Sequence, residues 1–171
     1  MRIFLIALLL FPLFSLSQTN DVYIRLTDAG GKQINGTSLT RGYERWITGL
    51  SIGSSGKNNT QLNFTMQISG AAAELKKAMA QGDWLLNGQV VVIRPTALQP
   101  LIQYRINMEK IKVLSCAETM GCDGNMTTSV TLSATRIGWT YYQQQKNGIP
   151  VVSNKFGYDA ETGSSWNNFQ P

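Results

Sequence analysis

The chain has 171 residues, of which 43% are hydrophobic, and a formal net charge of +5 at pH 7. This length suits one domain with a substantial core. Its basic residues are scattered instead of clustered, which argues against a nucleic-acid-binding protein. It has no His, so the commonest general base and metal ligand is missing. No carboxylate pair stands in a recognisable catalytic motif, and we expect neither an enzyme nor a cofactor or metal site.

Residues 1–17 have the pattern of a secretory signal peptide. Arg2 provides a positive charge, a nearly unbroken apolar run covers residues 3–14, and small residues precede the cleavage expected after Ser17. The segment is short for a membrane span, and an uncleaved anchor is the alternative. We expect a mature domain of residues 18–171 that is secreted or periplasmic and makes no membrane contact.

Export also decides how the two cysteines, Cys116 and Cys122, are interpreted. In an oxidising compartment a close, even pair is a candidate disulfide. Two free thiols are the alternative. A zinc site is not expected, because a structural zinc ion takes a full tetrahedral set of N or S ligands.

The first predicted strand covers residues 22–26, where apolar and polar side chains alternate. After a glycine-containing turn, a long polar loop begins at Ile34 and leads into a second strand at about Tyr43. Long ordered loops in compact domains tend to be functional. Trp46, near the end of this loop, either anchors its base in the core or contacts a partner.

The clearest alternation covers residues 61–68 and predicts a third strand. The single predicted helix covers residues 71–81, where strong helix formers place apolar side chains on one face. Ser69 is the expected N-cap residue, and Gly82 is expected just beyond the C-terminal end.

The second half of the chain predicts further strands. A parity change of the apolar positions suggests a β-bulge near Thr135 and Arg136. About seven strands and one short helix predict a mainly β, single-domain barrel or sandwich. The strands are expected over residues 84–93, 102–114, 130–141, 149–153 and 156–159, with a turn-rich loop over 116–125 and a loose tail over 162–171.

Several predicted strands have outward faces that are polar but carry few charges. Such faces suit subunit contacts or a water-filled lumen, and equally a low-charge extracellular surface. They are formed by Asn63, Thr65, Gln67, Gln103, Asn107, Thr127, Thr131, Ser133 and Thr135.

Short motifs occur in a fixed order along most of the mature chain. They are Asp-Val-Tyr-Ile-Arg-Leu at 21–26, Gly-Thr-Ser at 36–38, Gly-Tyr-Glu-Arg-Trp-Ile at 42–47, Ala-Gln-Gly at 80–82, Ile-Gly-Trp-Thr-Tyr at 137–141 and Phe-Gly-Tyr-Asp at 156–159. This order resembles the Hcp family, the tube-forming proteins of bacterial type VI secretion systems. Tyr43 and Arg45 stand where the family pattern has His and Gly, and the predicted signal peptide marks an exported variant.

The resemblance implies a small β-barrel with a helix at its side, built into hexameric rings that stack into a hollow tube. The chain itself is then its main partner, with secreted effectors and other secretion-apparatus proteins as further partners. The loop would contact a neighbouring subunit through Arg41, Gly42, Glu44 and Trp46. The pair Trp139 and Tyr141 belongs either to the core or to a subunit interface.

Two other functions stay open at this point. A secreted monomeric β-barrel could bind a small ligand or glycan without forming a tube. A toxic effector is a further alternative, although the absence of His and of an extra domain argues against it.

Overall fold

The computed structural model describes residues 20–56, 60–96, 100–145 and 149–171. The predicted signal peptide, residues 1–17, lies outside the described residues. Within these ranges, no helix has both the length and the apolar character needed to cross a bilayer.

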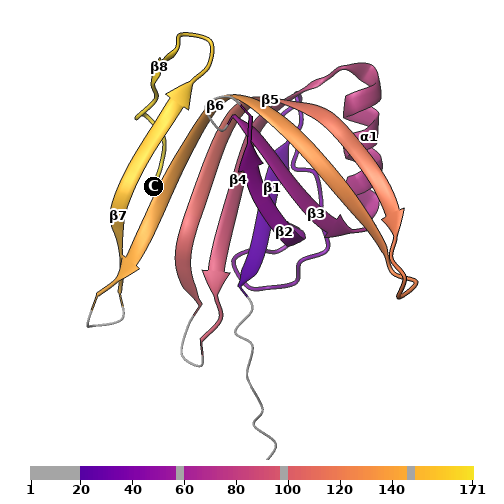
Figure 1. Cartoon of the computed structure of the whole chain (residues 1–171), viewed down its shortest axis with the longest axis horizontal. Helices are drawn as coiled ribbons and strands as arrows, with labels where there is room; N and C mark the ends of the chain where they lie inside the picture. The colour runs from indigo at the N-terminus through magenta and orange to yellow at the C-terminus, as the bar shows by residue number, and fades with distance from the viewer. Residues whose placement is uncertain (1–19, 57–59, 97–99, 146–148) are drawn as a thin grey trace, which may run out of the picture.

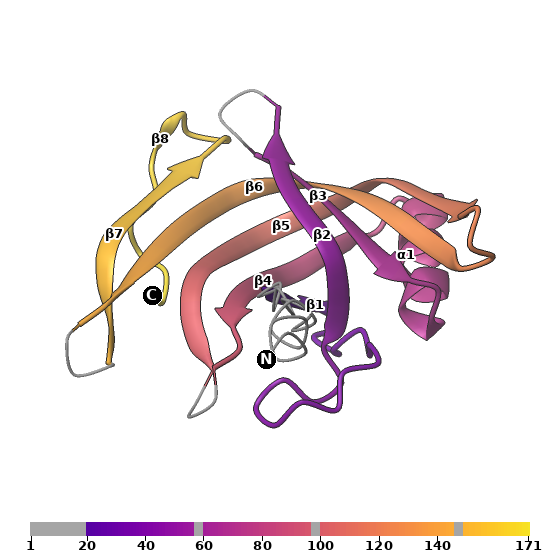
Figure 2. The same ribbon diagram turned by 60° about the horizontal axis from the view of Figure 1, so that its bottom comes forward.

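The fold is a β-barrel with one helix and a sheet extension, as Figures 1 and 2 show. The elements are β1 (Asp21–Thr27), β2 (Ile47–Ser55), β3 (Gln61–Gln67), α1 (Gly70–Gln81), β4 (Trp84–Arg94), β5 (Leu101–Met120), β6 (Met126–Gln144), β7 (Pro150–Asp159) and β8 (Ser164–Ser165). Their order in the sheet is β3-β2-β1-β4-β5-β6-β7-β8. An additional pairing of β3 with β6 closes β1 to β6 into a barrel. The mainly β barrel with one short helix is confirmed.

Strand β6 is long enough to pair with strands both in the barrel and in the sheet extension. Its first half, Thr127 to Ser133, pairs with β3 inside the barrel. Its second half, from Arg136 to Gln144, pairs with β7 outside it. The sheet therefore continues beyond the barrel, as Figure 2 shows on the side of β7.

The core forms where the alternating apolar faces of the strands meet. Leu62, Phe64 and Met66 are buried on the predicted face of β3. Helix α1 adds Leu75 and its neighbouring alanines to the same cluster. The helix ends at Gly82 with φ of 70°, as predicted. Ser69 occupies the N-cap position, but its side chain makes no capping hydrogen bond.

The prediction of a turn-rich loop over residues 116–125 is mostly wrong. Strand β5 continues to Met120, and Cys116 to Met120 pair with Val130 to Met126 of β6. Their side chains are small, polar or exposed, so the apolar alternation that marks a strand is missing here. The continuous backbone ladder with β6 nevertheless extends the strand.

The predicted β-bulge near Thr135 and Arg136 is also wrong. The pairing register of β5 and β6 is the same on both sides of this point, and the shift lies between Val113 and Ser115. Both strands do change the face that they bury here. Because they change together, no extra residue is needed, and Lys110 takes φ of 48° at this bend.

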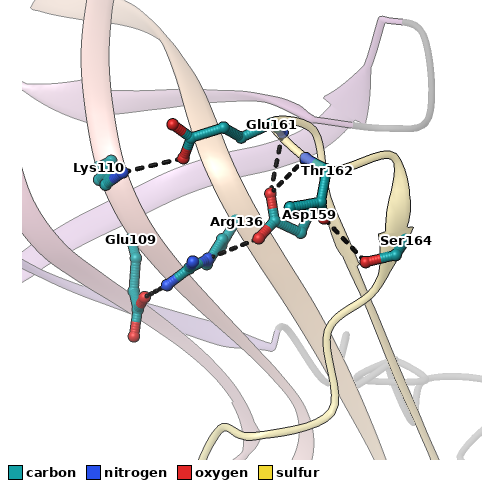
Figure 3. A network of polar contacts seen from close by, with 7 residues as sticks. All are labelled: Glu109, Lys110, Arg136, Asp159, Glu161, Thr162 and Ser164. Atoms are coloured by element: carbon teal, nitrogen blue, oxygen red, sulfur yellow. Dashed lines mark hydrogen bonds and ion pairs between the residues drawn. The ribbon is translucent and has the colours of Figure 1, made fainter.

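The tail expected to be loose is packed against the sheet. Strand β8 pairs with the end of β7, and Trp166 is only 8% exposed. A polar network at the start of the tail, drawn in Figure 3, joins β5, β6 and β7. In it, Arg136 donates to Asp159 at 2.8 Å and to Glu109 at 3.2 Å.

Candidate functional site

The loop between β1 and β2 starts from a firmly attached segment. Gln33 forms a β-bridge with Thr27, and the Ile34 N–H donates to the Leu26 carbonyl at 2.9 Å. The Ile34 side chain is 1% exposed and belongs to the core. The loop therefore leaves the barrel from a fixed point.

Beyond this point the loop folds back on itself. Gly36 N–H donates to the Arg45 carbonyl at 2.8 Å, Ser38 N–H to the Trp46 carbonyl at 3.0 Å, and Arg45 N–H to the Ser38 carbonyl at 2.8 Å. A Cβ on Gly36 would lie 2.3 Å from the Trp46 carbonyl oxygen. Only glycine allows the two arms of the loop to approach this closely.

The tip of the loop is a tight turn. Tyr43 N–H donates to the Thr40 carbonyl at 2.9 Å, and Gly42 has φ of 85°. The Glu44 carboxylate accepts a hydrogen bond from Gly42 N–H at 2.9 Å. Hydrogen bonds from the backbone N–H groups of Glu44 and Gly42 lower the pKa of Glu44 below its ordinary value, so this carboxylate is charged at neutral pH.

Aromatic side chains hold the base of the loop. Tyr43 stacks on Tyr23 with ring centroids 4.5 Å apart and meets Trp46 edge-on at 5.3 Å. The Arg25 guanidinium lies 5.0 Å from the centre of the Trp46 ring. Trp46 is 9% exposed, in a second buried cluster with Val91 and Ile93 of β4 and Tyr23. Trp46 therefore anchors the loop and does not present its ring to solvent.

The expected contact residues consequently separate into two groups. Arg41, Gly42 and Glu44 are exposed at the tip, whereas Trp46 is buried at the base. Sequence analysis missed Leu39, which is 94% exposed beside this tip. The available signal was a lone large apolar residue between polar neighbours, which is a weak signal because single exposed leucines are common on protein surfaces.

Comparison with known proteins identifies the family. The family model described as "Type VI secretion system effector, Hcp" matches residues 23–141. The chain belongs to the Hcp family. A search of curated protein sequences found no match.

Solved Hcp structures share the fold. Hcp1 from E. coli EAEC 042 is 23% identical with a TM-score of 0.66, covering 81% of this chain and 97% of its own. Hcp1 from Salmonella typhimurium is 20% identical with a TM-score of 0.69, covering 86% and 100%. The secreted protein Hcp3 from Pseudomonas aeruginosa is 15% identical with a TM-score of 0.63, covering 82% and 98%.

One departure from the Hcp pattern has a structural explanation. Arg45 occupies the position where the family pattern has Gly, and its φ is 62°. Positive φ is free for glycine and costly for a residue with a Cβ. The loop therefore still requires a positive φ at this position, and Arg45 adopts it at a conformational cost.

The two cysteines of this Hcp protein are free thiols. Cys116 Sγ lies 3.9 Å from the Ala72 carbonyl oxygen of α1, and burial raises the pKa of this thiol. Cys122 is exposed beyond the end of β5. From Cys116 to Met120 the extended strand spans about 13 Å, whereas bridged Cα atoms lie within about 7 Å. The two thiols are not bridged in this structure, and the pairing of Cys116 with Cys122 stays a prediction.

The aromatic pair expected in the core or at an interface lies where the Hcp barrel opens into the extended sheet. Trp139 is 3% exposed and stacks on Phe156 at 4.9 Å. Tyr141 and Phe156 are 39% and 45% exposed. Trp139 is therefore a core residue, while Tyr141 belongs to an apolar surface outside the barrel.

Proposed function

We propose that this Hcp protein is a structural subunit of a type VI secretion-like tube, in which hexameric rings stack through the loop between β1 and β2. Family membership supports the tube, and the hexameric number comes from the resemblance of the motifs. The observation that carries the loop assignment is Leu39, which is 94% exposed on a segment braced by its own backbone hydrogen bonds.

The loop has the properties of a preorganised contact. Its backbone is ordered before any partner binds, so association loses less conformational entropy. Leu39 would supply apolar burial, while Arg41 and the charged Glu44 beside it would supply polar pairing at the rim. Trp46 contributes indirectly by fixing the base.

A second surface supports contacts between neighbours within one ring. Tyr141 and Phe156 are exposed by 39% and 45%, and their ring centroids lie 6.2 Å apart. Large apolar side chains grouped on a sheet face that extends beyond the barrel are typical of interaction sites. We propose that this face meets the adjacent subunit, and that the assembled lumen carries secreted effectors.

The alternative of a monomeric ligand-binding barrel finds less support. Ile24, Leu62 and Leu132 are 0% exposed and fill the inside of the barrel. A small ligand or glycan would therefore have to bind the outside of the described domain. Export through residues 1–17 stays a prediction.

The loop assignment is tested by replacing Leu39 with serine in a chain that starts at Gln18. We expect wild-type protein to give rings and stacked tubes by negative-stain microscopy and a sixfold mass by light scattering. Leu39→Ser should keep the ring but lose the stacking, because the exposed apolar contact is gone. This change spares the hydrogen bonds of Gly36 and Ser38, which a deletion of residues 36–41 would remove.

Met120→Ser is the matched control, since Met120 is 66% exposed at the end of β5. It should leave rings and tubes unchanged. Tubes of normal length from Leu39→Ser, or a wild-type chain that stays monomeric at high concentration, would contradict the proposal.

A further inference from the structure

The C-terminal segment, residues 166–171, crosses the face of β5, β6 and β7 that points away from the barrel core, and Figure 1 shows the chain ending beside these strands. Three side chains of the sheet donate hydrogen bonds to main-chain oxygens of this segment. Lys155 Nζ donates to Asn167 at 3.2 Å and Phe169 at 2.6 Å, Asn107 Nδ2 donates to Gln170 at 2.8 Å, and Arg105 donates to Pro171. These contacts recognise an extended backbone and not particular side chains.

Two side chains of the segment pack together against the sheet, since Trp166 is 8% exposed and its ring centroid lies 4.8 Å from that of Phe169. Phe169 lies over Gly138 and Gly157, which pair across β6 and β7. A Cβ on Gly138 would lie 2.4 Å from the ring, and one on Gly157 would lie 2.8 Å from it. Lys155 Nζ lies 4.3 Å from the centre of the same ring. Glycines inside strands weaken a sheet, and here they form a socket for an aromatic ring.

The groove continues beyond the tail. A cleft of about 330 Å³ lies between the tail and β1, lined by Arg25, Gln89, Asn107 and Phe169 among others. Across the strands, Arg25 donates to Gln89 at 3.4 Å, and Gln89 donates to Asn107 at 3.0 Å. This row of amide and guanidinium groups extends the donors that already hold the tail.

The tail is joined to the barrel by a defined turn. Asp159 Oδ1 accepts from the N–H groups of Glu161 and Thr162 at 2.9 and 3.2 Å, and Gly163 has φ of 69°. Beyond this turn, β8 has only two residues. The segment after the turn can therefore separate from its own sheet without disturbing the barrel core.

We propose that this sheet face is a peptide-binding groove, that residues 166–171 are its displaceable occupant, and that a second copy can supply the same segment in trans. The contacts involve backbone oxygens and the rings of Trp166 and Phe169, so a second copy's tail with the same residues would make them equally well. Exchange of identical segments is a low-cost way to join protomers. In dilute solution each groove binds the tail of its own chain. The tail of a neighbouring copy competes for the groove once copies lie side by side. The groove is separate from the loop and does not depend on ring formation.

The test uses a chain ending at Ser165 and a fluorescein-labelled peptide with the sequence of residues 164–171. We expect saturable binding by fluorescence anisotropy to the shortened chain. Binding to the full chain should be roughly tenfold weaker or more, because its own tail competes at high effective concentration. A peptide with Phe169→Ala should lose binding, and so should the shortened chain carrying Lys155→Ala.

A full-length Phe169→Ala chain provides a second route if the shortened chain fails to fold. Its tail lacks the ring, so the wild-type peptide should bind it more tightly than it binds the wild-type chain. Folded variants that do not bind the peptide, or equal binding of the peptide with and without Phe169, would overturn the groove.

Supply in trans is tested by mixing two chains. Full-length Gly138→Leu has a blocked socket and hence a free tail, and the shortened chain has an open groove. Light scattering should show a complex of the two that is lost when the first chain also carries Phe169→Ala. A mixture without this Phe169-dependent complex would overturn exchange between copies, even where the peptide binds.

Discussion

At the scale of single residues, the loop between β1 and β2 depends on backbone conformations that most side chains avoid. Gly36 is enclosed by the opposite arm of the loop, with the Trp46 carbonyl 2.3 Å from where a Cβ would lie. Arg45 adopts φ of 62° despite its Cβ. The hydropathy pattern indicates neither the close approach at Gly36 nor the positive φ at Arg45. Only the motif resemblance pointed to a glycine at position 45.

Arg45→Gly should therefore stabilise the protein. Relief of positive φ favours the folded state, while glycine's extra freedom favours the unfolded state, and we expect a net gain of up to about 1 kcal/mol in the free energy of unfolding. Urea denaturation measures it. Arg45→Ala keeps a Cβ at positive φ and should change little. A loss of stability in Arg45→Gly would show that the Arg45 side chain contributes more than its conformation costs.

At the scale of elements, sequence patterns identified those parts that bury one regular face. Strand β3 and helix α1 were predicted within a residue or two because their apolar side chains repeat at the strand and helix periods. The end of β5 was missed because residues 116–120 face mainly solvent and are held by backbone pairing with β6. The docked tail was missed because Phe169 finds its socket on strands distant in sequence.

The packed face of α1 gives the prediction at this scale. Leu75 is 0% exposed in the core, so Leu75→Ala should lower the free energy of unfolding by about 2–4 kcal/mol through lost burial and the cavity left behind. Met79 is 37% exposed on the same helix, and Met79→Ala should cost less than about 1 kcal/mol. Chemical denaturation compares them, and similar losses would mean that the helix packs differently.

At the scale of the whole molecule, the network around Arg136 connects the bend of the barrel with the docked tail (Figure 3). Asp159 is 5% exposed. The hydrogen bond from Arg136, with further ones from the N–H groups of Thr162 and Glu161, lowers the pKa of Asp159 below its ordinary 3.8 although burial opposes this. The charged carboxylate therefore stabilises the folded state.

This stabilisation should be complete above the pKa of an unfolded Asp and disappear as pH falls through the lowered folded pKa. We expect the free energy of unfolding to fall below about pH 4, and Asp159→Asn to be less sensitive to pH in this range. Urea denaturation across this range measures both. Glu161→Gln is the control, because its pair with Lys110 is more than half exposed on both sides and contributes at most about 1 kcal/mol. An Asp159→Asn variant with unchanged acid sensitivity would contradict this role.

Closure of β3 against β6 leaves the outer side of β7 as the long unpaired border of the sheet among the described strands. Unpaired borders invite endless addition of strands from other molecules, the route to amyloid. Here Pro150 begins β7 without an N–H to offer, and β8 with its following Trp166 covers the other end at Tyr158, Asp159 and Gly157. If copies of this protein assemble as proposed, the protected border keeps them from joining edge to edge, which separates ordered growth from fibril formation.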